Sequence, residues 1–391
     1  MTNVWLWRHP RPTGHEGRCI GRTDVPVDPR KARRLARRIQ AHAQRRDLPT
    51  VVVTSPQRRA MAVAEKVRAT LDRPHLIDNF SYTSTGSIGI SLFPEHATTG
   101  DALLRCADAA MHHAKESGRG NRQFYTPSME ASAIDVLQHE RLLREAIVDN
   151  AFVLHYQPQI SLEDGSLQGL EALVRWRHPQ RGLVGPDEFI TFSESRGLIT
   201  PIGRWVMREA CRQLKEWQDE GLALVPVAVN LSALEFRQRD VAGEIAAALR
   251  DTGLAPQYLG IELTESVLMH QTGQVLDTLN ALKALGVGIS IDDFGTGYSS
   301  LAYLKRYPID SLKIDRSFVV DTPGNPDDVA IVTAVIQMAR SLQLKTVAEG
   351  VETPAQVQLL KGLGCDLIQG HVVSVPLDAV ALQRWMRDLP V

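Results

Sequence analysis

Two adjacent aspartates, Asp292 and Asp293, end the short apolar run 287–291 and are followed by a Gly-Thr-Gly turn at residues 295–297. Neighbouring carboxylates repel each other unless a positive charge lies between them, and a divalent cation supplies such a charge. The alternative is that a strand-end aspartate caps the next helix, which is the commoner role of a lone aspartate. The pair therefore suggests a cation site that other residues would complete.

Other polar residues recur on or just after similar apolar runs. The full set, with the two aspartates, is Glu171, Asn230, Glu262, Asp292, Asp293, Lys313, Glu349 and Gln369. Buried charges are costly unless they converge on partners, and one mouth of a barrel would bring strand ends together. Oxygen ligands of this kind suit Mg²⁺ or Mn²⁺ better than zinc.

The elements that must position these residues follow a regular alternation. Strand-like runs occur at 152–160, 169–175, 225–230, 259–263, 287–291, 311–314, 345–348 and 366–369. Helical patterns occur at 201–220, 240–251, 271–285, 327–342 and 354–363. Eight strands with intervening helices predict an α/β fold, a (β/α)8 TIM-like barrel over residues 132–391.

These motifs resemble the EAL family of phosphodiesterases, which hydrolyse cyclic di-GMP to the linear dinucleotide pGpG. The matching stretches are YQPQI (156–160), EALVRW (171–176), VNLS (229–232), ELTES (262–266), DDFGTGYSS (292–300), LKID (312–315), AEGVE (348–352) and QG (369–370). The resemblance covers the chain from about residue 137 onward, so it implies an EAL-type barrel as the largest domain.

The resemblance implies roles for individual residues. A two-metal centre of Mg²⁺ or Mn²⁺ would be held by Glu171, Asn230, Glu262, Asp292, Asp293 and Glu349, with Glu171, Lys313 and Glu349 taking part in catalysis. Cyclic di-GMP would contact Gln157, Leu173, Arg175, Gln369 and Pro376. Glu265 would hold the DFGTGYSS loop, and Glu352 would lie behind the metal ligands. Taken alone, Arg175 could equally form a surface ion pair and Leu173 could belong to the core.

The chain departs from the family after Gln369. The family usually continues as QGYxFSKP, whereas this chain reads QGHVVSVP, with His371, Val373 and Val375 in place of two aromatics and a lysine. Ser374 and Pro376 are retained. We expect weaker contacts to substrate with an intact metal centre, and the alternative is a cyclic di-GMP receptor of weak or no activity that signals through its N-terminal unit. Family members often dimerise through the helix and loop after the fifth strand, so a homodimer through the barrel is expected.

Residues 1–79 resemble the N-terminal half of a histidine phosphatase. Arg8 and His9 follow a predicted strand, and Arg59 follows a second one at 51–54, which could form a phosphate pocket. The second histidine and the acidic proton donor of that family are not found, so we interpret the segment as a remnant. A phosphomonoesterase that uses His9 is the third hypothesis.

Residues 80–129 resemble the C-terminal third of a GGDEF diguanylate cyclase domain, with the strand SIGISLFP and an amphipathic helix that includes CADAAMHHAKE. The sequence GGDEF itself does not occur in the chain, so this segment is not expected to synthesise cyclic di-GMP. Together with the first segment it would form a truncated α/β appendage to the barrel.

Composition fits this division. The 391 residues are 43% hydrophobic and 23% charged, and the four cysteines form no CxxC motif. Residues 1–79 carry 17 Lys/Arg against 7 Asp/Glu, but no aromatics interleave the basic stretch 30–46, so DNA or RNA binding is not expected. We find neither an 18-residue apolar run nor a secretion signal, which predicts a cytoplasmic protein without a transmembrane segment.

Overall fold

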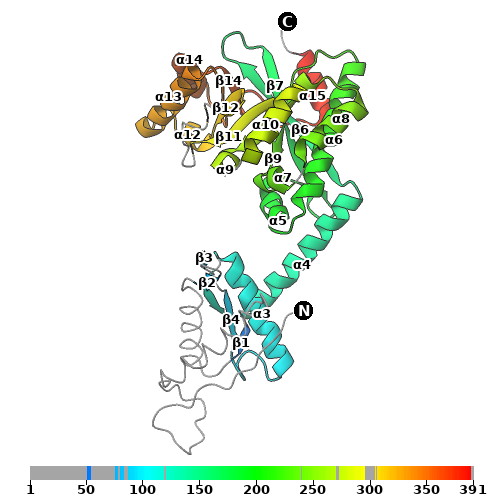
Figure 1. Ribbon diagram of the computed structural model, residues 1–391, viewed down its shortest axis with the longest axis vertical. Coiled ribbons are helices and arrows are strands. Elements are labelled where there is room, and N and C mark those ends of the chain that lie inside the picture. The colour runs from blue at the N-terminus through cyan, green and yellow to red at the C-terminus, as the bar shows by residue number, and fades with distance from the viewer. Residues whose placement is uncertain are drawn as a thin grey trace, which may run out of the picture. The chain divides into compact units, whose positions relative to one another are not determined.

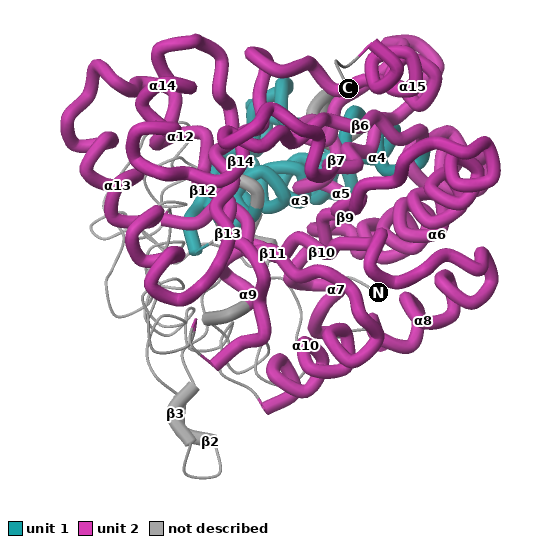
Figure 2. The backbone as a smooth tube through the Cα atoms, turned by 90° about the horizontal axis from the view of Figure 1, so that it is seen from above, with its two compact units in different colours: residues 1–141 teal, residues 142–391 magenta. Residues whose placement is uncertain are grey.

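The computed structural model describes residues 51–53, 75–77, 80–82, 87–118, 120–238, 240–269, 273–295, 304 and 306–388. The chain divides into two compact units, residues 1–141 and 142–391 (Figure 2). Helix α4 (Pro127–Val148) spans the division, so the domain boundary predicted near residue 132 falls inside a helix.

Unit 2 is a closed barrel of eight strands (Figure 1). In chain order these are β6 (Phe152–Ser161), β7 (Leu167–His178), β9 (Val227–Leu231), β10 (Leu259–Thr264), β11 (Gly288–Phe294), β12 (Ser311–Ile314), β13 (Lys345–Ala348) and β14 (Leu367–Gln369). Pairing of β6 with β7 closes the ring, and β8 (Gly182–Val184) adds a short strand to β7. The predicted barrel is confirmed.

The first strand of the barrel runs against the others. Strand β6 is antiparallel to both β7 and β14, while the remaining neighbours are parallel. The connection 162–166 is a tight turn, and a parallel arrangement would have needed a crossover of about a dozen residues or more. The first βα unit of the predicted (β/α)8 pattern is therefore a hairpin.

Helices surround the ring of strands (Figure 2). The five predicted helices are present as α6 (Ile199–Asp219), α8 (Val241–Thr252), α10 (Gly273–Leu285), α13 (Pro326–Ser341) and α14 (Pro354–Leu363). Shorter ones that were not predicted are α5 (Ile190–Ser195), α7 (Ala233–Gln238), α9 (Glu265–Met269), α12 (Arg316–Val319) and α15 (Ala379–Arg387). Local caps fix their starts: Thr353 forms a capping box with Gln356 at the start of α14.

Apolar and charged residues alternate along the strands, which separates the apolar core from the candidate site. Ile261 and Leu263 on β10 and Leu312 on β12 are fully buried in the apolar core, which lies between strands and helices. Glu262 and Lys313 are their immediate neighbours, and successive strand residues face opposite sides of a sheet. The polar residues therefore face the barrel axis, where they can meet.

In unit 1 a small parallel sheet has the order β1 (Val51–Val53), β4 (Ile88–Ser91), β5 (Arg122–Phe124), and helix α3 (Gly100–Glu116) packs on it. Strands β2 (His75–Ile77) and β3 (Phe80–Tyr82) form a separate antiparallel pair. The sheet joins residues from both sides of the boundary predicted at residue 79. Arg8, His9 and Arg59 lie outside the described residues.

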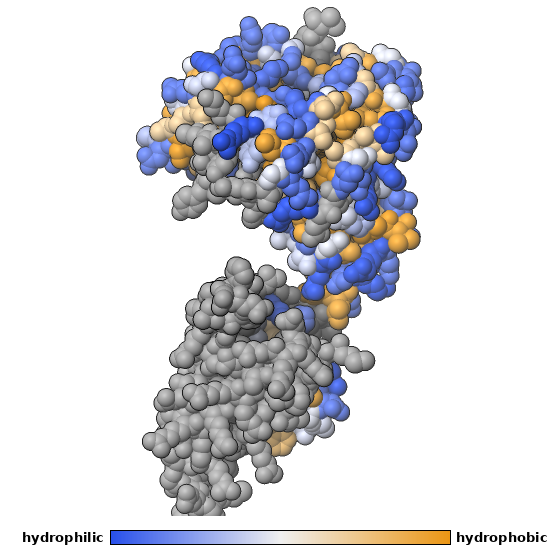
Figure 3. Space-filling view, in the orientation of Figure 1, coloured by the Kyte–Doolittle hydropathy of each residue, from blue (hydrophilic) through white to orange (hydrophobic). Residues whose placement is uncertain are grey.

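The face of unit 2 seen in Figure 3 is mostly hydrophilic, with smaller groups of apolar residues between. In the part of the chain that the structure describes, every helix is too short or too polar to cross a membrane.

Candidate functional site

Lys313 lies at the centre of four carboxylates inside the barrel. Its Nζ is 2.6 Å from Glu262 Oε2, 2.5 Å from Glu349 Oε1, 3.2 Å from Glu171 Oε2 and 3.4 Å from Asp292 Oδ1. The lysine side chain is 1% exposed. Four carboxylates around one cation leave an excess of negative charge, which favours binding of further positive charge.

Side-chain amides fix the orientation of Glu171. Asn230 Nδ2 donates to Glu171 Oε1 at 2.6 Å, and Gln369 Nε2 donates to Oε2 at 2.6 Å. Strands β7, β9 and β14 thus bring together three of the residues predicted from strand ends. Each oxygen of this buried carboxylate has a partner, which is the condition for keeping a charge in such a place.

A bulge lets both neighbouring aspartates face the same centre. The register between β11 and β12 shifts between Ile291 and Phe294, and Asp293 has a φ of 54°. In a regular strand Asp292 and Asp293 would point to opposite sides. The bulge and the left-handed backbone turn the second carboxylate toward the first, at a conformational cost of about 1–3 kcal/mol.

The acidic residues form two groups that share Asp292. One comprises Glu171, Glu262 and Asp292, the other Asp292, Asp293 and Glu349, and in each group one oxygen per residue lies within 4.8 Å of the others. A shared carboxylate between two three-ligand groups is the donor arrangement of a two-metal site. The described residues therefore fit two hard divalent cations.

Mutual repulsion and burial shift the acidity of this group. Burial and the neighbouring carboxylates raise the pKa of Glu262 well above its ordinary value, despite Lys313. Burial would also raise the pKa of Glu171, but Lys313 and the amides of Gln369 and Asn230 outweigh it and hold that pKa below the ordinary value. Burial would lower the pKa of Lys313, but its carboxylate partners raise it well above the usual range, so the lysine stays charged.

Metal binding is expected to release protons. Burial is the main cause that raises the pKa of Glu349 to about 8 and that of Asp293 to about 6, and the negative charge of Asp292 adds to both shifts. A raised pKa means that the carboxyl is protonated below that pH and must lose its proton to bind metal. Calorimetry with Mn²⁺ should show affinity that rises about tenfold per pH unit between about pH 6 and about pH 8. An affinity independent of pH, with no proton release between buffers of different ionisation enthalpy, would contradict this prediction.

The residues expected to contact substrate lie near the centre. Gln157 pairs directly with Glu171 across β6 and β7, and Leu173 and Arg175 follow Glu171 at two-residue intervals along β7. The same alternation places their side chains on the side of Glu171. The carbonyl oxygen of Pro376 lies 3.3 Å from Nδ1 of His155 on β6. Arg175 is half-buried, and burial lowers the pKa of its guanidinium, opposed by Asp187 and Glu171.

The structure places the two further glutamates differently. Glu265 is buried at the start of α9, and its Oε2 accepts a hydrogen bond from the backbone of Gly295 at 3.2 Å. It thus holds the first residue of the Gly-Thr-Gly turn, although residues 296–303 lie outside the described part. The side chain of Glu352 lies near the surface, where its Oε1 accepts a hydrogen bond from Arg316 Nη2 at 2.9 Å.

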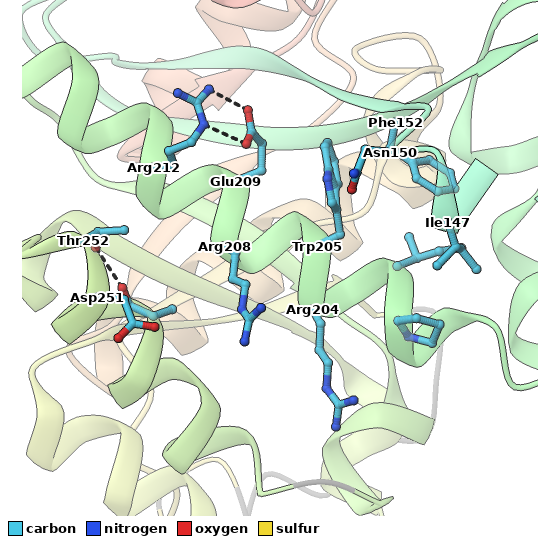
Figure 4. Close-up of a pocket in the computed structure, with 13 residues that line it drawn as sticks. Ile147, Asn150, Phe152, Arg204, Trp205, Arg208, Glu209, Arg212, Asp251 and Thr252 are labelled. Carbon is cyan, nitrogen blue, oxygen red and sulfur yellow. Dashed lines mark hydrogen bonds and ion pairs between the residues drawn. The ribbon is translucent and has the colours of Figure 1, made fainter. Parts of the chain in front are cut away.

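A cavity of about 510 Å³ lies elsewhere, between α6, α8 and the end of α4 (Figure 4). Trp205 and Arg208 of α6 line it, and its other arginines already have acidic partners: Arg204 pairs with Glu244, and Arg212 pairs with Glu209. The carboxylates around Lys313 do not line it, so this cavity is separate from the candidate metal site in the barrel.

Two residues near the site were missed by the sequence analysis. Asp315 interacts with Asp293, and Gln159 hydrogen-bonds Gln369. Asp315 lies two residues after Lys313 in the LKID stretch, and Gln159 lies two residues after Gln157 in YQPQI. The two-residue spacing along a strand was the signal that could have found them.

Comparison with models of known protein families matches both parts of the chain. The EAL domain family model matches residues 140–376, and the GGDEF (diguanylate cyclase) family model matches residues 33–121. The chain belongs to the EAL domain family. The GGDEF match begins well before residue 80, so it includes much of the segment that was interpreted as a phosphatase remnant; the comparisons do not show a histidine phosphatase.

Two similar proteins come from Pseudomonas aeruginosa. The chain is 43% identical over 328 residues to the cyclic di-GMP phosphodiesterase NbdA, covering 84% of this chain and 42% of NbdA. It is 46% identical over 323 residues to the bifunctional diguanylate cyclase/cyclic di-GMP phosphodiesterase MucR, covering 83% of this chain and 47% of MucR. The chain thus spans somewhat less than half the length of these curated relatives.

Among solved structures, the PaMucR phosphodiesterase in its c-di-GMP complex is 48% identical, with a TM-score of 0.61. The match covers 63% of this chain and 99% of that one. The EAL domain of Xanthomonas citri FimX in complex with c-di-GMP is 26% identical, with a TM-score of 0.58, over 63% of this chain and 97% of that one.

Proposed function

We propose that the EAL barrel of this chain hydrolyses cyclic di-GMP to linear pGpG with two bound Mg²⁺ or Mn²⁺ ions. The observation that carries this proposal is the pair of three-carboxylate groups that share Asp292. Similarity to the phosphodiesterases NbdA and MucR supports the choice of substrate.

In this proposal the chain's own residues hold and orient the reactants. Glu171, Asn230, Glu262 and Asp292 would hold one cation, and Asp292, Asp293 and Glu349 would hold the other. When bound, two such cations activate a water molecule and neutralise charge on the phosphodiester. Lys313 keeps its proton because its neighbours raise its pKa, so it donates hydrogen bonds from Nζ and keeps the carboxylates and the attacking water in position.

The substrate would lie across β6 and β7 at the barrel mouth. Arg175 would bind a phosphate, Gln157 would lie beneath the dinucleotide, and Leu173 and Pro376 would pack on guanine or ribose. The rim segment 371–376 contributes less to substrate binding than it does in typical family members, because His371, Val373 and Val375 replace two aromatics and a lysine. We therefore propose that the metal centre is competent and that substrate affinity is reduced.

Restoring the lysine at the rim tests this idea. Val375 is 52% exposed, so Val375→Lys can be accommodated and would place a charge where the family has one. We expect KM for cyclic di-GMP to fall about three- to tenfold with kcat within about twofold, because a cation binds the substrate phosphate equally in ground and transition states. The matched control is Val380→Lys, at a 58% exposed valine on α15. An unchanged KM would show that the rim does not limit affinity.

The direct test of the proposed activity is incubation of the full chain with cyclic di-GMP and Mg²⁺ or Mn²⁺, with chromatographic separation of the products. We expect pGpG to accumulate, and chelation with EDTA to stop it. Binding of cyclic di-GMP without pGpG would instead support a receptor that signals through the N-terminal unit. Hydrolysis of a simple phosphate monoester, lost in His9→Ala, would support the third hypothesis.

The proposal extends to assembly and location. A homodimer through the helix and loop after β11 would connect the interface to Asp292 and Asp293, and a cytoplasmic location would give access to the substrate. Sedimentation of the active protein as a monomer would contradict the dimer.

A further inference from the structure

A buried chain of three glutamines runs beneath Glu171. Gln159 Nε2 donates to Gln369 Oε1 at 2.8 Å, and Gln369 Nε2 donates to Gln157 Oε1 at 3.0 Å as well as to Glu171 at 2.6 Å. Gln157 Nε2 then donates to the carbonyl oxygen of Ser374 at 3.1 Å. The three glutamines are at most 9% exposed, so these hydrogen bonds form away from bulk water.

The reversed strand β6 makes this chain possible. Its antiparallel register pairs Gln159 directly with Gln369 on β14 and with Gly169 on β7, and pairs Gln157 with Glu171. A Cβ at position 169 would lie 2.9 Å from Gln159 Oε1, so the glycine leaves the space that the Gln159 side chain occupies.

The hydrogen bonds have a defined direction. A carboxylate oxygen only accepts hydrogen bonds, so Glu171 requires the amide nitrogen of Gln369 to face it. The oxygen of Gln369 must then face Gln159, where a buried carbonyl oxygen needs a donor. Gln159 supplies that donor. Without it, the Gln369 amide loses the contact that keeps its nitrogen on Glu171.

We propose that Gln159 is a positioning residue that sets the orientation of the Gln369 amide and, through it, the presentation of Glu171 to metal. This inference rests on the proposed phosphodiesterase function. Gln369 donates directly to Glu171, whereas Gln159 acts one side chain farther away, through its hydrogen bond to Gln369.

The test removes the donor while keeping the length of the side chain. For Gln159→Met we expect kcat to fall about tenfold with KM within about twofold, and the Mn²⁺ dissociation constant to rise about threefold or more, because partners of metal ligands affect both affinity and rate. Gly169→Ala should reproduce these effects, since its Cβ pushes against Gln159, and should add nothing to Gln159→Met. Gln213→Met is the matched control, at a glutamine of α6 that is also 8% exposed but lies outside this chain of hydrogen bonds.

A double-mutant cycle separates positioning from a general loss of packing. If Gln159 acts through Gln369, then Gln159→Met changes kcat less than about twofold in a Gln369→Met background. An equal effect in both backgrounds, or a Gln159→Met variant with wild-type kcat and Mn²⁺ affinity, would overturn the inference. If the wild-type protein yields no pGpG, the proposed function fails, and the Mn²⁺ affinities of the same variants still decide whether Gln159 positions Glu171.

Discussion

Lys313→Met is expected to destabilise the metal-free protein by about 3–5 kcal/mol, because it leaves buried carboxylates without their cation. Nζ of Lys313 lies within 3.4 Å of a carboxylate oxygen of each of four residues, Glu171, Glu262, Asp292 and Glu349. No single neighbour can therefore compensate for the loss of its positive charge. The loss should be smaller at low pH. Glu349 and Glu262 have raised pKa values, so protonation relieves their repulsion as the pH falls below about 8.

Urea unfolding in EDTA and in Mn²⁺ measures this effect. Bound Mn²⁺ should stabilise Lys313→Met more than it stabilises the wild type, because the metal then supplies the only positive charge in the cluster. Hydrolysis should remain at least about a hundredfold below wild type even with saturating Mn²⁺, since in the proposed mechanism the lysine also positions the attacking water. Lys361→Met, at an exposed lysine of α14, is the control. A metal-free Lys313→Met variant that loses less than about 1 kcal/mol would refute the charge-balance argument.

Glu171→Gln is expected to lower kcat at least about a thousandfold while the barrel stays folded. The substitution keeps the shape of the side chain but replaces one of the oxygens proposed to bind metal, and it removes the charge that Lys313, Asn230 and Gln369 face. A neutral amide ligates Mg²⁺ or Mn²⁺ poorly compared with a carboxylate.

Single-turnover hydrolysis and Mn²⁺ calorimetry distinguish the causes of this loss. We expect Mn²⁺ binding to weaken at the Glu171 group, while the group of Asp292, Asp293 and Glu349 still binds one ion. Glu163→Gln, at an exposed glutamate in the turn between β6 and β7, should behave as wild type. A Glu171→Gln variant with more than about a tenth of the wild-type kcat would show that Glu171 is not a metal ligand.

The positions of the eight strands and of the acidic residues on them could be predicted because alternation within a strand is local. Glu262 and Lys313 stand out as charges between residues that are fully buried, Ile261 and Leu263 in one case and Leu312 and Ile314 in the other. The antiparallel direction of β6 could also have been predicted, since residues 162–166 are too few for the crossover that a parallel neighbour needs. The regular alternation of strands and helices favours an all-parallel (β/α)8 barrel instead.

Features that depend on contacts between distant strands were not predictable. The bulge that turns Asp293 toward Asp292 arises from the register between β11 and β12. The contact between Gln159 and Gln369 joins residues 210 positions apart, and only the pairing of β6 with β14 creates it. The resemblance implies that Glu352 lies behind the metal ligands, whereas its spacing after Glu349 indicates the following loop. The ion pair of Glu352 with Arg316 near the surface could not be predicted from either.

Anomalous diffraction from crystals grown with Mn²⁺ tests the two-metal account most directly. The account predicts two manganese peaks in the barrel, roughly 4 Å apart, with Asp292 in contact with both. A single peak, or two peaks without Asp292 between them, would contradict it.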